Sequence, residues 1–114
     1  MSKIQLLMLV YIVLGLVVAG LGVPLVLRRI KPNPFYGVRL GRTMKDEKMW
    51  YAVNAYVGRW LVALGLLTAI LALVVAAFPG ISILRYTLTV LGIVGVGTIA
   101  AMVFSWRYIR SLDH

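Results

Sequence analysis

Three long stretches of the chain contain no charged residue, and almost every charge lies between or beside them. They cover residues 4–27, 60–84 and 86–106, and they are 24, 25 and 21 residues long. A helix needs about 20 residues to cross the hydrocarbon core of a bilayer. The pattern therefore predicts an all-α membrane protein with three transmembrane helices, at about residues 4–27, 58–78 and 84–106.

Composition supports one membrane domain over residues 1–114. Hydrophobic residues make up 62% of the chain and charged residues 13%, whereas soluble proteins have about 45–50% and 25%. The chain has no cysteine, which excludes disulfides and thiolate metal sites. The first apolar stretch runs past the length of a signal-peptide core, about 7–15 residues, and ends in Arg28-Arg29, so we expect a retained helix.

Basic residues gather on one side of the predicted bundle. Ten lie in or beside the link after the first span and in the C-terminal tail: Arg28, Arg29, Lys31, Arg39, Arg42, Lys45, Lys48, Arg59, Arg107 and Arg110. The opposite side has only Lys3 and Arg85. Because Lys and Arg favour the cytoplasmic side, we expect a plasma-membrane protein with its N-terminus outside and with link 28–57 and the C-terminus in the cytoplasm. The net charge of +9 then indicates anionic lipid headgroups, and not nucleic acid, as a partner of the link.

Small residues predict where helices approach closely. Gly15 and Ala19 are four residues apart and share one face of the first span. The third span has a second set of small residues, which we expect to form another close-packing face: Gly92, Gly95, Gly97, Ala100 and Ala101. Such faces would also support a homo-oligomer.

The end of the link has the pattern of a helix start. Thr43 can cap, and Asp46 or Glu47 would lie in the first turn, where the helix dipole favours a carboxylate. Apolar residues then recur at helical spacing: Met49, Val53, Tyr56 or Val57, and Trp60. This predicts an amphipathic helix before the second span, which either lies in the interface or docks under the bundle. Gly58 is the expected place for a bend; without one, residues 44–78 form a single helix about 50 Å long.

The chain has few residues that could carry chemistry. Its only carboxylates are Asp46, Glu47 and Asp113, and its only histidine is His114. We expect no catalytic residue, no metal site, no cofactor and no enzyme, because neither a catalytic triad nor a metal cluster can be assembled from this set. The three uncharged stretches contain no acidic or basic residue, and Arg59 lies at the cytoplasmic edge of the second; this disfavours a proton-coupled transporter.

The link carries a specific run of residues, Lys31-x-Asn33-x-x-Tyr36-Gly37-Val38-Arg39. It continues with Thr43, Glu47, Trp50, Asn54 and Gly58. Over about 28 residues this resembles the signature of the SdpI family, small bacterial and archaeal membrane proteins named after an immunity protein against a secreted toxin peptide. Asn54 stands where that family often has histidine.

The resemblance implies that the link has a defined structure, and it points to nine residues as the candidate binding or functional motif: Asn33, Tyr36, Gly37, Arg39, Thr43, Glu47, Trp50, Asn54 and Gly58. Arg39 is expected to bind Glu47 or helix carbonyls, while Tyr36 and Trp50 pack together as an interfacial cover. Two hypotheses stay open: the link is the working site, or it only holds the first two spans together.

The resemblance implies a function in immunity to a membrane-active toxin peptide, or in relaying the presence of that peptide to the cytoplasm. The partners would be the peptide or a cytoplasmic regulator. The alternative is a structural or accessory subunit of a membrane complex, and a small transporter component is less favoured.

Overall fold

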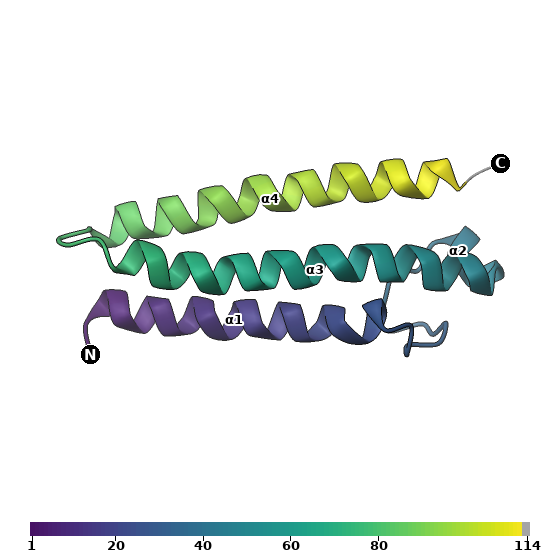
Figure 1. Cartoon of the computed structure of the whole chain (residues 1–114), viewed down its shortest axis with the longest axis horizontal. Coiled ribbons are helices and arrows are strands. Elements are labelled where there is room, and N and C mark those ends of the chain that lie inside the picture. The colour runs from purple at the N-terminus through teal and green to yellow at the C-terminus, as the bar shows by residue number, and fades with distance from the viewer. Residues whose placement is uncertain (113–114) are drawn as a thin grey trace.

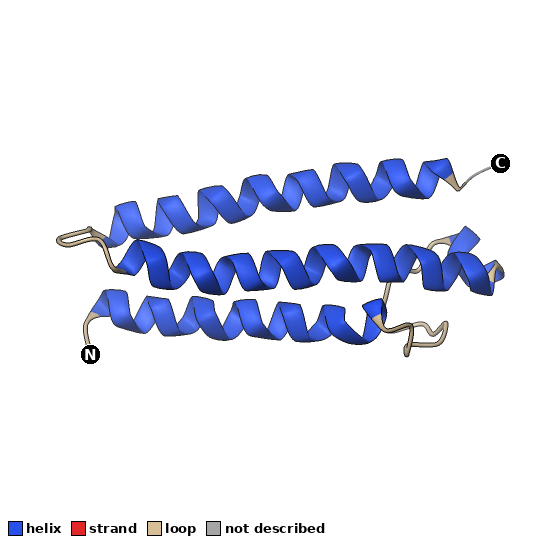
Figure 2. Cartoon of the chain, viewed as in Figure 1, coloured by secondary structure: helices blue, strands red, loops and turns tan. Residues whose placement is uncertain are grey.

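Three long helices lie side by side, with the second of them in the middle (Figure 1). The computed structural model describes residues 1–112, apart from the side chain of Arg42. The helices in this part are α1 (Lys3–Val26), α2 (Gly41–Lys45), α3 (Glu47–Ala76) and α4 (Ile83–Ser111), and residues 1–112 include no strand (Figure 2). The molecule measures 53 × 23 × 18 Å.

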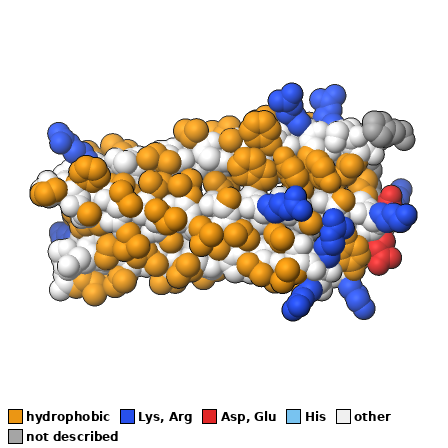
Figure 3. Space-filling view, in the orientation of Figure 1, with side chains coloured by type: hydrophobic (Ala, Val, Ile, Leu, Met, Phe, Trp, Pro, Cys, Tyr) orange, Lys and Arg blue, Asp and Glu red, His pale blue; other side chains and the backbone are white. Residues whose placement is uncertain are grey.

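The long helices confirm the predicted all-α fold with three membrane spans. Each of α1, α3 and α4 is long and apolar enough to cross a membrane. Hydrophobic side chains cover the flanks of the bundle, and Lys and Arg side chains gather at the end where α3 begins (Figure 3). An apolar flank of this kind is suited to lipid tails. The helices also suit a bilayer because their backbone N–H and C=O groups bond to each other within each helix.

Of the two alternatives for the region before the second span, the structure has the continuous helix and not the bend at Gly58. Helix α3 begins at Glu47 and runs through Gly58 to Ala76, so the amphipathic segment forms its first turns. Asp46 caps α3, because its side chain accepts hydrogen bonds from the backbone N–H groups of Lys48 and Met49 at 3.0 and 3.4 Å. The prediction of Thr43 as the cap is wrong, since Thr43 lies within α2 and its hydroxyl bonds the link instead.

Helix α1 ends in a turn that reverses the chain toward the link. Arg28 has a φ of 58°, and the backbone N–H groups of Arg28 and Arg29 donate to the carbonyls of Leu25 and Pro24 at 3.2 and 3.0 Å. This is the pattern of a Schellman cap, with arginine where glycine is usual. The last turn of α1 therefore accommodates Pro24 and still satisfies the carbonyls at the helix end.

The interface between α1 and α3 is made by backbone against backbone. A Cβ atom added to Gly22 would lie 2.6 Å from the carbonyl oxygen of Gly58, and one added to Gly15 would lie 2.5 Å from that of Gly65. Both pairs are seven residues apart along their helices, the repeat of left-handed helix pairing. Ala19 is buried between the two pairs. The close-packing face predicted around Gly15 and Ala19 is thus confirmed.

The interface between α3 and α4 is made by side chains. The rings of Trp60 and Phe104 stack at 5.9 Å, and those of Tyr56 and Tyr108 at 4.2 Å. Toward the other end, the buried Tyr86 hydroxyl donates to the carbonyl of Ala72 at 2.9 Å. Aromatic stacking and one hydrogen bond therefore fix α4 on α3.

The small-residue face predicted for the third span is only partly used. Ala101 is buried, and a Cβ added to Gly97 would lie 2.9 Å from the Leu64 side chain, so both pack within the monomer. No atom lies within 4 Å of a Cβ added to Gly92 or Gly95. Gly92 is exposed, so this part of the face does not pack within the monomer.

Candidate functional site

The first turns of α3 extend beyond the end of α1, and the link folds around them (Figure 1). With Gly22 opposite Gly58, the last residue of α1, Val26, is level with about Asn54. Residues 47–53 then project about 10 Å farther, at 1.5 Å per residue. The link supplies the side chains and backbone that bury this projecting segment.

Trp50 and Asn54 fasten the link to α3. Trp50 has no exposed surface, and its indole Nε1–H donates to the Ile30 carbonyl at 2.8 Å. Asn54 is 2% exposed; its Oδ1 accepts from the Val38 backbone N–H at 2.5 Å, and its Nδ2 donates to the Trp50 carbonyl at 2.9 Å. Two side chains one turn apart on α3 thus bind both ends of the link segment 30–38.

Gly37 lets the link pass close to these two side chains. Its φ is +110°, a region that residues with a Cβ rarely adopt. A Cβ at this position would lie 2.8 Å from Asn54 Oδ1 and 3.1 Å from the Trp50 ring. Both backbone conformation and space therefore require glycine here.

Asn33 organises the turn between the two fastened ends. Its Oδ1 accepts from the backbone N–H groups of Phe35 and Tyr36 at 2.9 and 2.7 Å. Its Nδ2 donates to the carbonyls of Lys31 and Tyr36 at 2.7 and 3.0 Å. One amide side chain satisfies four backbone groups, which is why asparagine suits a turn between two prolines.

Tyr36 connects the link to α1. Its hydroxyl donates to the carbonyl of Leu21, in the turn of α1 just before Pro24. Partial burial of the phenol raises the pKa of Tyr36 above its ordinary value of 10.0, because desolvation disfavours the phenolate. The hydroxyl therefore stays a hydrogen-bond donor at neutral pH.

Thr43 closes the second half of the link. Its side chain is fully buried, and its Oγ1 accepts from the Leu40 backbone N–H at 2.9 Å. As a donor, the same hydroxyl has two carbonyl oxygens within reach, that of Val38 at 3.0 Å and that of Leu40 at 2.9 Å. Thr43 thus reaches back from the first turn of α2 to Leu40, the residue just before this helix.

Arg39 and Glu47 are not brought together, contrary to the expected ion pair. The Arg39 guanidinium donates to the carbonyl of Pro34, which lies in the link. Both Arg39 and Glu47 are exposed, and Phe35 at the tip of the turn is 90% exposed. These three side chains are exposed, whereas Asn33, Thr43, Trp50 and Asn54 hold the fold of the link.

Two other predicted site residues have different surroundings from those expected. Gly58 lies in the α1–α3 interface opposite Gly22 and not in the link. Trp50 is enclosed and does not form an exposed interfacial cover with Tyr36. The sequence analysis identified Tyr36, Trp50 and Asn54. It did not identify the backbone groups that they bind, those of Leu21, Ile30 and Val38. The available signal was a tryptophan and an asparagine four residues apart on one helix.

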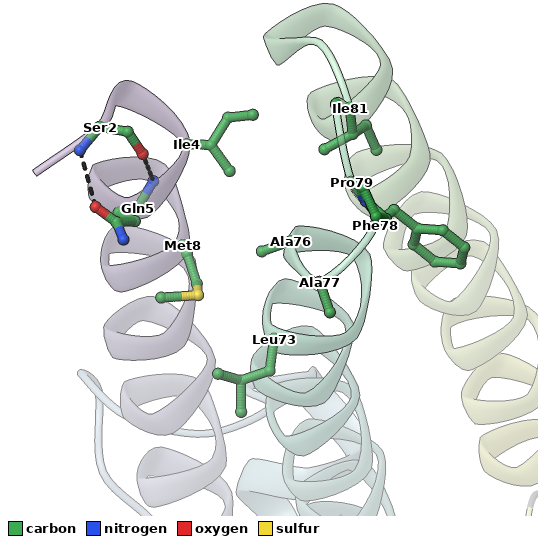
Figure 4. Close-up of a pocket in the computed structure, with 11 residues that line it drawn as sticks. Ser2, Ile4, Gln5, Met8, Leu73, Ala76, Ala77, Phe78, Pro79 and Ile81 are labelled. Atoms are coloured by element: carbon green, nitrogen blue, oxygen red, sulfur yellow. Dashed lines mark hydrogen bonds between the residues drawn. The ribbon is translucent and has the colours of Figure 1, made fainter.

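A second candidate site lies at the opposite end of the molecule. A cavity of about 560 Å³ opens between the start of α1 and the α3–α4 connection, with Met8 and Leu73 deep between the helices and Phe78 pointing away (Figure 4). Its polar side chains, Ser2 and Gln5, bond each other's backbone N–H groups as a capping box. With these groups occupied, the cavity offers mainly apolar contact.

The described residues contain little that could carry out a reaction. Among residues 1–112, no three His, Cys, Asp or Glu side chains lie close enough to hold a metal ion. In the same part, every buried side-chain nitrogen or oxygen has a hydrogen-bond partner. What the turn of the link exposes is an aromatic ring and a guanidinium, those of Phe35 and Arg39.

Comparison with known families identifies the same region. The model of the SdpI/YfhL protein family matches residues 29–105, which include the link, α3 and most of α4. No curated protein and no solved structure matches the chain.

Proposed function

Because the chain belongs to the SdpI/YfhL protein family, we propose that it is a non-enzymatic membrane protein that confers immunity to a membrane-active toxin peptide or relays the presence of that peptide. The observation that carries this proposal is the folded link. Residues of the family pattern, from Asn33 to Asn54, form one hydrogen-bonded unit that joins α1 and α3. A rigid unit of this kind pre-orders a binding surface.

The outward-facing side of the link is the proposed recognition surface. Arg39 and Phe35 are exposed on a segment whose backbone is fixed by Asn33, Trp50 and Asn54. An exposed aromatic ring beside a guanidinium is a common composition of protein-binding surfaces. We place this surface on the cytoplasmic side of the plasma membrane, because the basic residues gather at this end (Figure 3).

Survival of a sensitive bacterium that expresses the protein tests the proposal. Cells are challenged with a panel of membrane-active peptides, and wild type is compared with Arg39→Ala at equal membrane abundance. We expect wild type to protect and Arg39→Ala to lose most of the protection. Arg85→Ala is the matched control, since it removes an exposed arginine from the opposite end of the bundle and should protect as wild type does.

The possible outcomes separate the alternatives. Protection that both variants retain would contradict the link as the working site and leave it as a structural connection. Absence of protection by wild type would contradict immunity and favour an accessory subunit of a membrane complex. Immunity by sequestering the toxin peptide and relay of its presence to the cytoplasm require different partners. Relay requires a soluble protein that co-purifies through the link, whereas sequestration requires only the peptide.

A further inference from the structure

An apolar groove lies between α1 and α3 near the basic end of the bundle. It has a volume of about 320 Å³ and is lined by Val23, Val26 and Leu27 of α1 and by Arg59, Val62 and Ala63 of α3. Arg59 is the single charged lining residue. The groove runs beside the contact of Gly22 with Gly58, the residues next to Val23 and Arg59.

Arg59 lies deeper in the bundle than Arg28 and Arg29 at the start of the link. Its neighbour Gly58 is opposite Gly22, about one helical turn inside the end of α1 at Val26. Arg28 and Arg29 follow beyond that end. The guanidinium of Arg59 is therefore attached to a part of α3 that is surrounded by apolar side chains, where a charge without a counter-ion is costly.

The described protein residues offer Arg59 no carboxylate. The nearest acidic residue along α3 is Glu47, twelve residues away and so about 18 Å along the axis. Asp46 precedes it and is occupied in capping α3; Asp113 lies outside the described residues. Arg59 is exposed on the surface that faces the groove and the surrounding lipid.

We propose that this groove binds one anionic phospholipid. Its phosphate pairs with the Arg59 guanidinium, whose planar fork suits two phosphate oxygens, and an acyl chain lies against the apolar lining. Two more basic residues, Arg28 and Arg29, follow the lining residue Leu27 along the chain, and they add positive charge at the end of the bundle where the headgroup would lie. This arrangement favours a lipid with net negative charge over phosphatidylcholine, whose choline would be repelled. The proposal does not depend on the immunity function.

Native mass spectrometry of the full-length protein tests the site. Protein is released from micelles with equal amounts of phosphatidylglycerol and phosphatidylcholine, and the lipids that stay bound are counted. We expect wild type to retain one phosphatidylglycerol. Arg59→Gln should weaken that retention about fivefold, the effect of one cation near a lipid surface. Arg59 is exposed, so the variant should keep the wild-type helix content, which circular dichroism checks.

Two further variants make the result specific to the groove. Arg107→Gln is the matched control: Phe104 stacks on Trp60 and Tyr108 on Tyr56, so Arg107 lies at nearly the same depth on α4, away from the groove. It should retain phosphatidylglycerol as wild type does. Ala63→Leu keeps every charge but fills the groove, and it should lower retention. Equal losses with Arg59→Gln and Arg107→Gln, or full retention with Ala63→Leu, would overturn the proposal, because attraction would then come from the basic end as a whole.

Discussion

The central helix α3 is joined to its two neighbours in different ways. Toward α1 it presents Gly58 and Gly65, so the two backbones meet, and the link adds hydrogen bonds beyond the helix end. Toward α4 it presents Trp60, Tyr56 and the carbonyl of Ala72, so the contacts are made by side chains. The difference indicates that α1, the link and α3 form one rigid unit, on which α4 is held less tightly.

The largest expected effect comes from breaking the backbone contact with α1. Gly65→Ala places a Cβ 2.5 Å from the backbone nitrogen of Ala19, so the helices must separate. We expect the free energy of unfolding to fall by about 3 kcal/mol, the upper end for an overpacked site. Unfolding in mixed micelles of increasing SDS content measures it.

Gly92→Ala on α4 is the matched control for this variant. No atom lies within 4 Å of a Cβ there, so stability should stay equal or rise by up to about 1 kcal/mol through helix propensity. Equal losses in the two variants would contradict the distinction between the interfaces.

A second, smaller effect is expected from Gly37→Ala in the link. The new Cβ is strained at φ +110° and contacts Asn54 Oδ1, so local stability should fall by about 2 kcal/mol. Hydrogen exchange of the Val38 amide, which donates to Asn54, reports this opening. Gly41→Ala should leave the exchange rate unchanged, because a Cβ there has open space; faster exchange in both variants would show that the link is sensitive to any substitution.

On the α4 side, Tyr86→Phe removes the one hydrogen bond between Tyr86 and Ala72. Interhelical hydrogen bonds in membranes contribute modestly, so the free energy of unfolding should fall by about 1 kcal/mol. The same SDS titration measures it. Thr98→Val, which loses only a bond within α4 to Val94, should change less; a loss above that of Gly65→Ala would reverse the comparison.

The smallest effect is the pH dependence of the contact between Tyr36 and α1. The pKa of Tyr36 is raised in the folded protein above 10.0, so the stabilisation is fully present below pH 10 and is lost as pH rises through the folded value. Hydrogen exchange or tyrosine absorbance between neutral and strongly alkaline pH follows it. Tyr36→Phe should remove this dependence, and an unchanged alkaline loss in that variant would assign it to another group.

The three spans could be predicted because lipid selects helices by length and apolar character alone. The close approach at Gly15 and Ala19 was predictable from their spacing. For Gly92 and Gly95 no contact forms within the monomer, because spacing does not reveal which face of α4 turns to α3. Their use in an oligomer stays a prediction.

The link was predictable in its residues but not in its contacts. Trp50 bonds the Ile30 carbonyl, and Asn54 bonds the Val38 amide, across 20 and 16 residues of chain. A sequence pattern marks the side chains, but every backbone group along the link is an equally available partner until the chain path is known. For the same reason neither of the two partners considered for Arg39, Glu47 or a helix carbonyl, is the one it contacts, since its guanidinium donates to the Pro34 carbonyl in the link.

The order of residues was enough to identify a three-span helical membrane protein with a basic link of SdpI type. The folded chain was needed to show that α3 runs straight through Gly58, that the link is fastened by buried Trp50 and Asn54, and that Arg59 borders an apolar groove. The two kinds of feature differ in the range of the interactions that produce them. Burial of apolar length in lipid is a local property of a segment, whereas glycine contacts, hydrogen bonds to distant backbone and grooves exist only where two segments meet.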